Sequence, residues 1–376
     1  MDGRALMSDD STRPSILFAA GGTGGHLFPA IAIAEEIKSL RPTVHIIFVG
    51  TKNKIEADVA PKKGFAFATI WISGFHRRLT AENLLFPLKV IVSLVQSFFL
   101  MRKEKPGVVV GTGGYVCGPI LYVASVLGIP TAVHESNSYP GVTTRLLASR
   151  VTKLFLTFDV TKRWLGNADA EKAEVTGTPT RASLGTVTQK EGRHFFSLDP
   201  EKKTLLVFGG SLGAASINSF IDRIGAELSK HDIQLIWQTG ATDFERYRSK
   251  KDNNRWIGKF IEKMEFGYAA ADVVLCRSGA TTLAELTRLG KPAILVPYPL
   301  AAANHQELNA QTMLDAGAAL MVMDSELGVK GLRTITETLS DKNLLATMHL
   351  NSLRLGKPNA GKEIAERILS LLPQRP

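Results

Sequence analysis

A glycine-rich turn that ends in a histidine is the part of this 376-residue sequence with the clearest chemical potential. Four of the five residues from Gly21 to Gly25 are glycines, and without a Cβ their backbone N–H groups can approach a ligand closely. The imidazole of a histidine titrates at about pH 6.5, so His26 can take a proton from a hydroxyl group or donate a hydrogen bond to an anion. The turn is not the dinucleotide fingerprint, because Leu27 stands where that motif has its last glycine. We therefore expect it to bind a sugar or a phosphate.

Two further clusters combine side chains that hydrogen-bond well to sugar hydroxyl groups. The string HESN at residues 134–137 joins an imidazole, a carboxylate and an amide, and NHQE at residues 304–307 repeats this mixture. One such cluster could be an ordinary polar loop, but two favour a carbohydrate site. Glu135 is the alternative to His26 as a general base, although a carboxylate needs burial to raise its pKa for that task.

A third candidate site runs from Ser278 to Glu285, where a loop enters a helix with a carboxylate in its first turns. The N–H groups of a helix N-terminus can face a pyrophosphate, and Glu285 can accept hydrogen bonds from both hydroxyl groups of a ribose. The alternative is that Glu285 only complements the helix dipole, which is worth about 0.3–1 kcal/mol. The motif alone leaves both interpretations open.

Alternating strands and helices must position these groups. Short apolar runs, each followed by a turn and an amphipathic stretch, predict parallel strands at residues 16–18, 44–49, 108–110, 131–133, 151–156, 204–208, 233–237, 273–276 and 293–296. The stretch 30–40 predicts the first helix. Glycine-rich loops follow the strands at Gly21, Gly111 and Gly209, and ligands of such sheets bind at the carboxyl ends of strands. Simple tight turns are the alternative explanation of these loops.

The pattern of strands and helices occurs twice, on either side of a Gly- and Pro-containing hinge near Gly177. We therefore expect an α/β protein of two doubly wound parallel-sheet domains, with bounds at 15–177 and 178–358 and a C-terminal helical segment at 359–376 that packs back across the domains.

Composition narrows the class of protein. Hydrophobic residues make up 44% and charged residues 21% of the chain, as in globular proteins, and two cysteines suit a reducing compartment. The net charge of +10 is spread along the chain without a polybasic tail, so we expect no nucleic-acid partner. The motifs Asp-x-Asp, Cys-x-x-Cys and His-Glu-x-x-His are absent, so we expect neither a metal nor another cofactor.

The most hydrophobic stretch runs from Leu84 to Met101, within a region of basic residues between Phe75 and Lys105. Its polar positions fall on one helical face, and they are too many for a good transmembrane helix. It could be a core helix with one solvated polar stripe. It could also lie on an anionic membrane, where each basic residue adds about 1 kcal/mol.

Seven motifs in a fixed order resemble those of the MurG enzymes. They are GGTGGHLFPA, GTGGYVCGP, HESN, GTPTR, GGSLGA, CRSGATTLAE and NHQELNA. The resemblance extends from about Ile16 to Ile368 and implies a GT-B fold of two Rossmann-like domains around a cleft. It also implies inverting transfer of N-acetylglucosamine from UDP-N-acetylglucosamine to lipid I, undecaprenyl-pyrophosphoryl-MurNAc-pentapeptide, to form lipid II. The protein would then act peripherally on the cytoplasmic face of the membrane, with the acceptor in the first domain and the donor in the second.

The resemblance also implies roles for individual residues. Donor binding would involve Thr23, Gly24, Gly25, Asn137, Arg181, Ser211, Ile261, Ala280, Thr281, Thr282, Leu283, Ala284, Glu285 and Gln306. The acceptor diphosphate would be held by Gly111, Thr112, Gly113, Gly114 and Tyr115. Asn137 would contact the N-acetylglucosamine, Ile261 the uracil through its backbone, and Gln306 the sugar hydroxyl groups.

Two alternatives share the expected architecture. One is another UDP-sugar transferase with a glycolipid or small acceptor, and the other is a UDP-N-acetylglucosamine 2-epimerase, which needs no lipid-facing surface. An oxidoreductase is not expected, because the dinucleotide fingerprint and its ribose-binding acid are missing.

Overall fold

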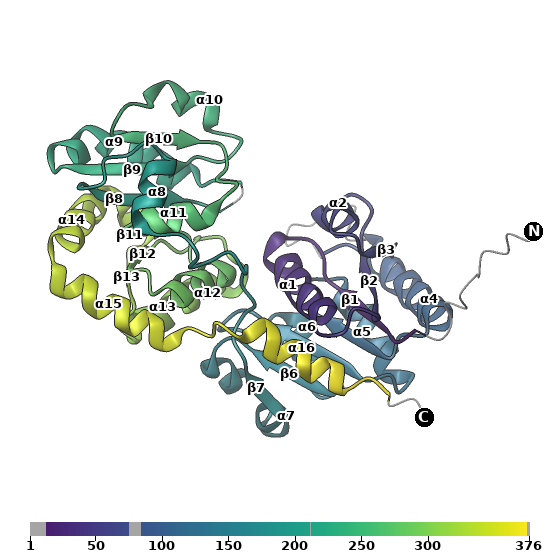
Figure 1. Cartoon of the computed structure of the whole chain (residues 1–376). Coiled ribbons are helices and arrows are strands. Elements are labelled where there is room, and N and C mark those ends of the chain that lie inside the picture. The colour runs from purple at the N-terminus through teal and green to yellow at the C-terminus, as the bar shows by residue number, and fades with distance from the viewer. Residues whose placement is uncertain (1–12, 75–83, 211, 374–376) are drawn as a thin grey trace, which may run out of the picture. The chain divides into compact units, whose positions relative to one another are not determined.

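The computed structural model describes residues 13–74, 84–210 and 212–373, which form two compact units (Figure 1). Within those ranges, the first unit takes residues up to 136, 140–176 and those from 359 on, and the second takes 137–139 and 177–358. The chain thus enters the second unit briefly at 137–139, well before the hinge at Gly177.

The first unit is built on a seven-stranded parallel sheet with the order β3-β2-β1-β4-β5-β6-β7. Its strands are β1 (Ser15–Ala19), β2 (His45–Gly50), β3 (Ala66–Thr69), β4 (Val108–Gly111), β5 (Thr131–Glu135), β6 (Lys153–Leu156) and β7 (Ala173–Val175). The central strands are buried along their whole length, as β1 illustrates, which is typical of a parallel sheet covered by helices on both faces.

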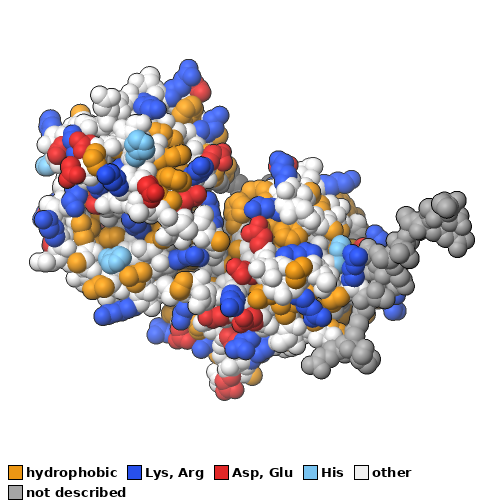
Figure 2. All heavy atoms as spheres, in the orientation of Figure 1, with side chains coloured by type: hydrophobic (Ala, Val, Ile, Leu, Met, Phe, Trp, Pro, Cys, Tyr) orange, Lys and Arg blue, Asp and Glu red, His pale blue; other side chains and the backbone are white. Residues whose placement is uncertain are grey.

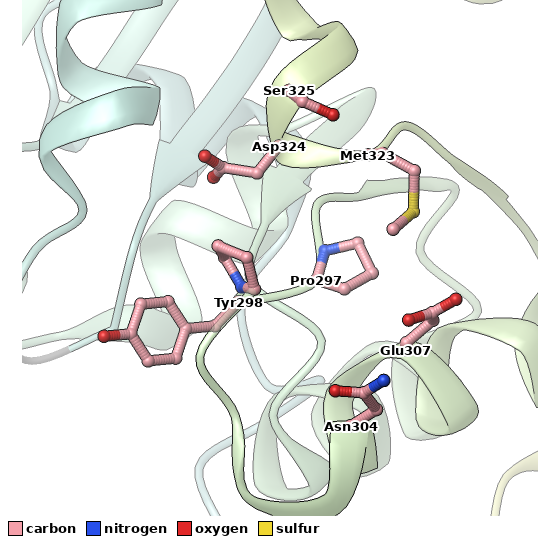
Figure 3. A pocket seen from close by; sticks show the side chains of 8 residues that line it. Pro297, Tyr298, Asn304, Glu307, Met323, Asp324 and Ser325 are labelled. Atoms are coloured by element: carbon pink, nitrogen blue, oxygen red, sulfur yellow. The ribbon is translucent and has the colours of Figure 1, made fainter.

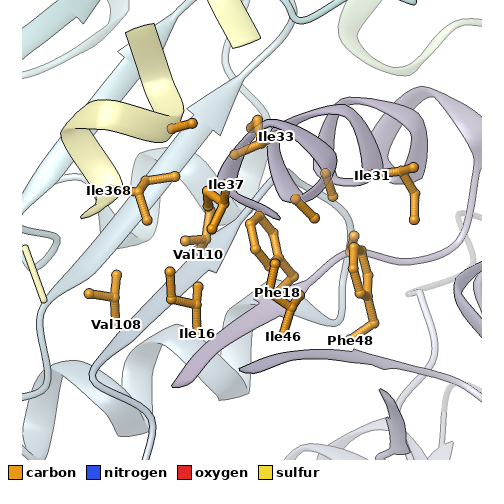
Figure 4. Packing of buried hydrophobic residues seen from close by; sticks show 14 of the residues in the cluster. Ile16, Phe18, Ile31, Ile33, Ile37, Ile46, Phe48, Val108, Val110 and Ile368 are labelled. Atoms are coloured by element: carbon orange, nitrogen blue, oxygen red, sulfur yellow. The ribbon is translucent and has the colours of Figure 1, made fainter. Parts of the chain in front are cut away.

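The helices of this unit cover both faces of that sheet. They are α1 (Gly24–Leu40), α2 (Ile55–Lys62), α4 (Phe86–Glu104), α5 (Cys117–Val126), α6 (Val142–Leu147), the 3₁₀ segment η2 (Asp159–Trp164), α7 (Asn167–Lys172) and α16 (Ala360–Ser370). Figure 4 shows Ile31, Ile33 and Ile37 of α1 lying over the side chains of β1, β2 and β4. Helix α1 begins six residues earlier than expected, so that His26 lies in its first turn and Pro29 inside it.

The C-terminal helix α16 belongs to the first unit although it follows the second in sequence. It packs against α1, and Ile364, Ala365 and Ile368 are buried in the same core cluster (Figure 4). Arg367 also pairs with Glu174 beside it, at 3.1 Å between Nε and Oε2. The end of the chain therefore supports the helix that carries His26.

The second unit has a six-stranded parallel sheet with the order β10-β9-β8-β11-β12-β13. Its strands are β8 (Lys203–Phe208), β9 (Ile233–Gln238), β10 (Arg255–Gly258), β11 (Val273–Cys276), β12 (Ala293–Leu295) and β13 (Ala319–Met321). Its helices are α8 (Gln189–Phe195), α9 (Ala215–Lys230), α10 (Phe244–Tyr247), η3 (Arg248–Lys250), α11 (Met264–Ala270), α12 (Ala280–Leu289), η4 (Ala302–Asn304), α13 (His305–Asp315), η5 (Asp324–Glu326), α14 (Leu327–Ser340) and α15 (Lys342–Leu355). The expected fold class of two Rossmann-like parallel-sheet domains is confirmed.

Strand register places the motif-bearing loops of each unit side by side. Ala19 at the end of β1 pairs with Gly111 at the end of β4, and Phe208 of β8 pairs with Cys276 of β11. Both pairs lie where the strand order reverses, because β1 and β8 each stand between the strand that follows them and a later one. Such switch points form crevices at the carboxyl ends of open α/β sheets.

Helix α4 contains the most hydrophobic stretch of the chain, and two of its polar residues, Ser93 and Ser97, face inward. Ser93 and Ser97 are fully buried, whereas Ile91 is 60% and Phe99 65% exposed. The two hydroxyl groups donate to carbonyls of their own helix, to Val90 at 2.8 Å and Ser93 at 2.6 Å, so their burial leaves no donor unsatisfied. The interpretation of a solvated polar stripe is therefore wrong for Ser93 and Ser97, whereas Gln96 of the same stripe is exposed. No helix among the described residues is long and apolar enough to cross a membrane.

Candidate functional site

In the first unit, the glycine-rich turns after β1 and β4 pack directly against each other. A Cβ on Gly114 would lie 2.3 Å from the carbonyl oxygen of Gly21, and one on Gly113 would lie 2.4 Å from Nδ1 of His26. Gly22 has a φ of +93°, and a Cβ there would lie 3.0 Å from the ring of Tyr115. The glycines are thus required for close contact between the two turns, which brings the expected residues 23–26 and 111–115 together.

His26 is fixed by the turn that follows β4. Its Nδ1 lies 3.1 Å from the carbonyl oxygen of Thr112, and the hydroxyl of Thr112 donates to the carbonyl of His26 at 2.7 Å. A carbonyl only accepts hydrogen bonds, so Nδ1 of the neutral ring must carry the proton. Nε2 is then the basic nitrogen, which is the tautomer that a general base requires.

Glu135, the alternative base, caps a helix. Its Oε2 accepts hydrogen bonds from the N–H of Gly141 at 2.9 Å and from the hydroxyl of Thr144 at 2.6 Å, at the start of α6. The side chain is 5% exposed. Both hydrogen bonds tie the carboxylate to the start of α6, whereas His26 is held by Thr112 through Nδ1, so the geometry favours His26 as the base.

In the second unit, the N-terminus of α12 carries the residues expected to bind a nucleotide. Its N-cap is Gly279, which provides no side-chain hydrogen bond to the helix. The hydroxyl oxygen of Thr281 is buried and, among the described residues, has no hydrogen-bond partner. The expected residues 280–285 thus include both the N–H groups of a helix N-terminus and an unsatisfied buried hydroxyl, which is a suitable environment for a diphosphate.

Glu285 lies one turn further along α12 and is 4% exposed. Its Oε2 accepts a hydrogen bond from the hydroxyl of Tyr268 at 2.8 Å, and its Oε1 lies 3.2 Å from Nε of Arg181. Burial raises the pKa of Glu285 above its ordinary value, although Arg181 and Tyr268 both act in the opposite direction. A buried carboxylate kept at a cost to stability is typical of a binding residue.

Replacing Glu285 with glutamine should raise the melting temperature of the unliganded protein at neutral pH. A carboxylate whose pKa is raised by folding contributes its full stability below the pKa of the unfolded chain and loses it as pH rises through the folded pKa. The advantage of Glu285→Gln should therefore shrink as pH falls from 7.5 towards 4.5. Melting curves of both proteins across this range test the prediction. A wild type more stable than the variant at pH 7.5 would show that the ion pair with Arg181 outweighs desolvation.

Gln238, which the sequence did not single out, ends β9 and joins the loops that follow β8 and β10. Its Nε2 donates to the carbonyl of Gly210 at 3.0 Å, and its Oε1 accepts from the N–H of Ile261 at 2.9 Å. Because the backbone N–H of Ile261 already donates to Gln238, the expected backbone contact of Ile261 with uracil would have to be made by its carbonyl group. Ser211 lies outside the described residues.

Asn309 is a second residue that the sequence did not single out, although it lies in the string NHQELNA. It is fully buried, and its Oδ1 accepts from the N–H of Ser138 at 2.8 Å. Its Nδ2 donates to Oδ1 of Asn137 and to the carbonyl of Ser278, both at 3.2 Å. Asn309 thereby holds Asn137 beside the loop that leads into α12. The sequence could have indicated Asn309, because it follows Gln306 by three residues and so lies on the same face of the helix.

Gln306 belongs to the same group. Its side-chain oxygen accepts from the N–H of Tyr298 at 3.0 Å, and its carbonyl accepts from the hydroxyl of Ser278 at 2.7 Å. The neighbouring pocket, with a volume of about 180 Å³, is shown in Figure 3. It is lined by Pro297, Tyr298, Pro299, Asn304, Glu307, Met323, Asp324 and Ser325. Two members of the second polar cluster, Asn304 and Glu307, therefore line a concave surface.

The first comparison with known proteins concerns protein families. Residues 16–156 match the glycosyltransferase family 28 N-terminal domain, and residues 204–368 match the glycosyltransferase family 28 C-terminal domain. The boundary between the two matches falls between β6 and β8, where the first unit gives way to the second.

Individual relatives agree with this family. A UDP-N-acetylglucosamine--N-acetylmuramyl-(pentapeptide) pyrophosphoryl-undecaprenol N-acetylglucosamine transferase of Chlorobaculum tepidum is 43% identical over 363 residues, which is 95% of this chain and 99% of the relative. The crystal structure of Acinetobacter baumannii MurG has a TM-score of 0.75 at 26% identity and covers 95% of this chain and 99% of that one. A Neisseria meningitidis UDP-GlcNAc 2-epimerase has a TM-score of 0.67 at 16% identity, covers 95% of this chain and 100% of that one, and shares the fold alone.

Proposed function

The chain belongs to the MurG family of glycosyltransferases, and from that premise we propose that it transfers N-acetylglucosamine from UDP-N-acetylglucosamine to lipid I in peptidoglycan synthesis. The acceptor atom is the 4-hydroxyl oxygen of the N-acetylmuramic acid. It forms a bond to the anomeric carbon of the donor as the bond from that carbon to the diphosphate oxygen breaks. The proton leaves the hydroxyl group, UDP departs, and the product is lipid II.

The N-terminus of α12 is the observation that carries this proposal. Its N–H groups and the buried, unsatisfied hydroxyl of Thr281 suit the two phosphates of UDP, and their interaction strengthens as charge develops on the leaving diphosphate. Glu285 accepts hydrogen bonds from the hydroxyl groups of the ribose, and Arg181 beside it adds a positive charge. Asn137 and Gln306, gathered by Asn309 and Ser278, contact the sugar. The carbonyl of Ile261 meets the uracil.

His26 is the proposed base for the acceptor hydroxyl group in the first unit. The hydrogen bond of Nδ1 to Thr112 leaves the basic character at Nε2 and holds the ring in one orientation. The turn from Gly111 to Tyr115, in contact with His26, binds the diphosphate of the lipid. Thr23, Gly24 and Gly25 lie at the exposed start of α1 and contact the transferred sugar.

A donor screen by thermal shift, followed by a transfer assay, tests the proposed function. UDP-N-acetylglucosamine at 100 times its dissociation constant should stabilise the protein by about 2.7 kcal/mol, and it should outrank UDP-glucose and the GDP-linked sugar. Radiolabelled donor mixed with lipid I in detergent should then yield a labelled lipid product. Turnover of the donor without acceptor would contradict the transferase and favour the epimerase, which only the shared fold supports.

The outer surface of α4 is the proposed membrane contact. Leu88, Ile91, Val95 and Phe99 are between 49% and 65% exposed along this helix. Arg102 and Lys103 lie in its last turn, and the guanidinium carbon of Arg102 is 5.4 Å from the centre of the Phe98 ring. Apolar side chains beside basic ones suit the surface of an anionic bilayer. The polyprenyl tail of the acceptor stays in the bilayer, so we place the protein on its cytoplasmic face.

Reversing Arg102 and Lys103 to glutamate should weaken binding to anionic vesicles at least about tenfold, because each basic residue near the surface contributes about 1 kcal/mol. Salt should weaken the binding of the wild type in the same way. Vesicle co-sedimentation measures both effects. The matched control is the reversal of Lys342 and Arg354 to glutamate, two exposed residues on α15 of the second unit, which should leave vesicle binding unchanged. Vesicle binding that is unaffected by salt and by the reversal of Arg102 and Lys103 would contradict the membrane role. Arg77 and Arg78, expected in the same basic region, lie outside the described residues.

The distribution of charge on the surface bears on the expected absence of a nucleic-acid partner. Figure 2 shows basic and acidic side chains interspersed over the visible face of each unit. Among the described residues on that face, no broad positive patch of the kind that attracts a polyanion is visible, and we propose no nucleic-acid partner.

A further inference from the structure

Glu56 is a fully buried carboxylate that the steps above do not use. It lies in the first turn of α2, and its partners are two turns of the first unit. Its Oε2 accepts a hydrogen bond from the N–H of Gly22 at 3.2 Å. Its Oε1 accepts from the N–H of Thr51 at 3.1 Å and from the hydroxyl of Thr51 at 3.0 Å. Hydrogen bonds to an ionised acceptor are stronger than those between neutral groups.

The surrounding backbone leaves just enough room for this side chain. A Cβ on Gly50, the last residue of β2, would lie 2.2 Å from Cγ of Glu56. A Cβ on Gly21 would lie 3.0 Å from its Oε1. Glycine therefore stands at the end of β2 and in the turn after β1, where the carboxylate lies. The contact joins the end of β2 to the turn from which His26 projects.

The direction of the Gly22 hydrogen bond decides what that turn can bind. The N–H of Gly22 points inward to Glu56 and is unavailable to a ligand. A carboxylate on the inner side of the turn also repels an anion that approaches the outer side. The turn therefore suits a neutral sugar hydroxyl group better than a phosphate, in spite of its four glycines between residues 21 and 25.

We propose that Glu56 is a positioning residue for the transfer reaction. It holds Gly22 in its left-handed conformation, and through Gly22 it sets the start of α1 and the place of His26. It also reserves this turn for the sugar end of the substrates, so that diphosphates bind elsewhere. The expected effect on turnover rests on the proposed function, whereas the hydrogen bond between Glu56 and Gly22 does not depend on it.

Glu56→Gln tests the proposal because it removes one contact selectively. The amide keeps an oxygen for the two donors of Thr51 but turns an NH₂ group towards the N–H of Gly22, where two donors then face each other. We expect kcat to fall about 100-fold, as for a misplaced catalytic group, with the dissociation constant of UDP-N-acetylglucosamine within about twofold of wild type. Hydrogen exchange of the Gly22 amide should accelerate.

Glu35→Gln is the matched control, since Glu35 is an exposed carboxylate of α1 that pairs with Lys63 of the same unit. It should leave turnover, donor affinity and Gly22 exchange unchanged. A folded Glu56→Gln protein with kcat within threefold of wild type, or with a loss confined to donor affinity, would overturn the proposal. If that variant does not fold, Glu56→Asp decides, because it keeps the charge but is one methylene too short to hold Gly22 and Thr51 together.

Two readouts separate this inference from the proposed function. A wild-type protein that makes no lipid product contradicts the transferase, whatever Glu56 does. Unchanged Gly22 exchange in Glu56→Gln contradicts the role of Glu56, whatever the reaction.

Discussion

Replacing His26 with alanine should lower kcat by about 10²- to 10⁴-fold, the usual contribution of a positioned general base. A hydroxyl group is a poor nucleophile near neutral pH, so the proton must leave as the new glycosidic bond forms. Nδ1 of His26 donates to the carbonyl of Thr112, which directs the lone pair of the neutral ring to Nε2. The donor should bind as in wild type, because its main contacts lie in the second unit. Steady-state transfer rates and donor titrations on the same preparations measure both quantities.

His45→Ala is the matched control, because His45 is an exposed histidine at the start of β2 in the same unit. Its kcat should equal that of wild type. The acid limb of the pH profile of kcat/KM should disappear in His26→Ala and persist in the control. A loss of turnover below tenfold, or a loss of donor affinity alone, would move the proton to Glu135 or to water.

Replacing Glu285 with alanine should weaken UDP binding by about 1.5–3 kcal/mol for each hydrogen bond that its carboxylate makes to the ribose. This corresponds to about 10- to 150-fold in the dissociation constant for one such bond. The side chain is held in place by Tyr268 and Arg181, so it is already oriented when the nucleotide arrives. Isothermal titration with UDP and with uridine-free pyrophosphate separates the ribose contact from the phosphate contacts.

Glu307→Ala is the control for this experiment, since Glu307 is an acidic residue of the same unit that lines the pocket beside Gln306. Its effect on UDP affinity should be small, because it lies on α13 rather than on the helix that receives the phosphates. If Glu285→Ala binds UDP as tightly as wild type does, Glu285 only complements the dipole of α12. The assignment of the ribose would then fail while the pyrophosphate site at α12 could stand.

The strands that the sequence did not predict are all at sheet edges. The interior strands were evident as runs of apolar residues, because both faces of an interior parallel strand are covered. The missed strands β3, β7, β10 and β13 end the two sheets. They are only three or four residues long and half-covered, and β3 has the exposed pattern Ala66-Phe67-Ala68-Thr69. Such segments become strands only because a neighbour is there to pair with them.

The buried face of α4 shows a second limit of predictions from sequence patterns. Periodicity placed Ser93, Gln96 and Ser97 on one face of the helix, but it could not say which residues of that face are buried, and Gln96 is exposed. Burial of Ser93 and Ser97 is possible because their hydroxyl groups are satisfied by their own helix, and their small size lets α4 pack closely on α5. The buried face of α4 therefore combines these serines with apolar residues such as Leu94 and Met101, while Ile91 and Phe99 are exposed.

Local sequence patterns were sufficient to predict the fold class, the family and the positions of the loops that carry chemistry. These features depend on local properties: strand-length apolar runs, glycines where no Cβ fits, and motifs of contiguous residues. The side chains that support those motifs become evident from the folded chain alone. Glu56 holds Gly22 from 34 residues away, and Asn309 holds Asn137 from 172 residues away. Buried polar side chains take their partners from whatever the fold places beside them, because an unsatisfied group is costly, and no local pattern records that choice.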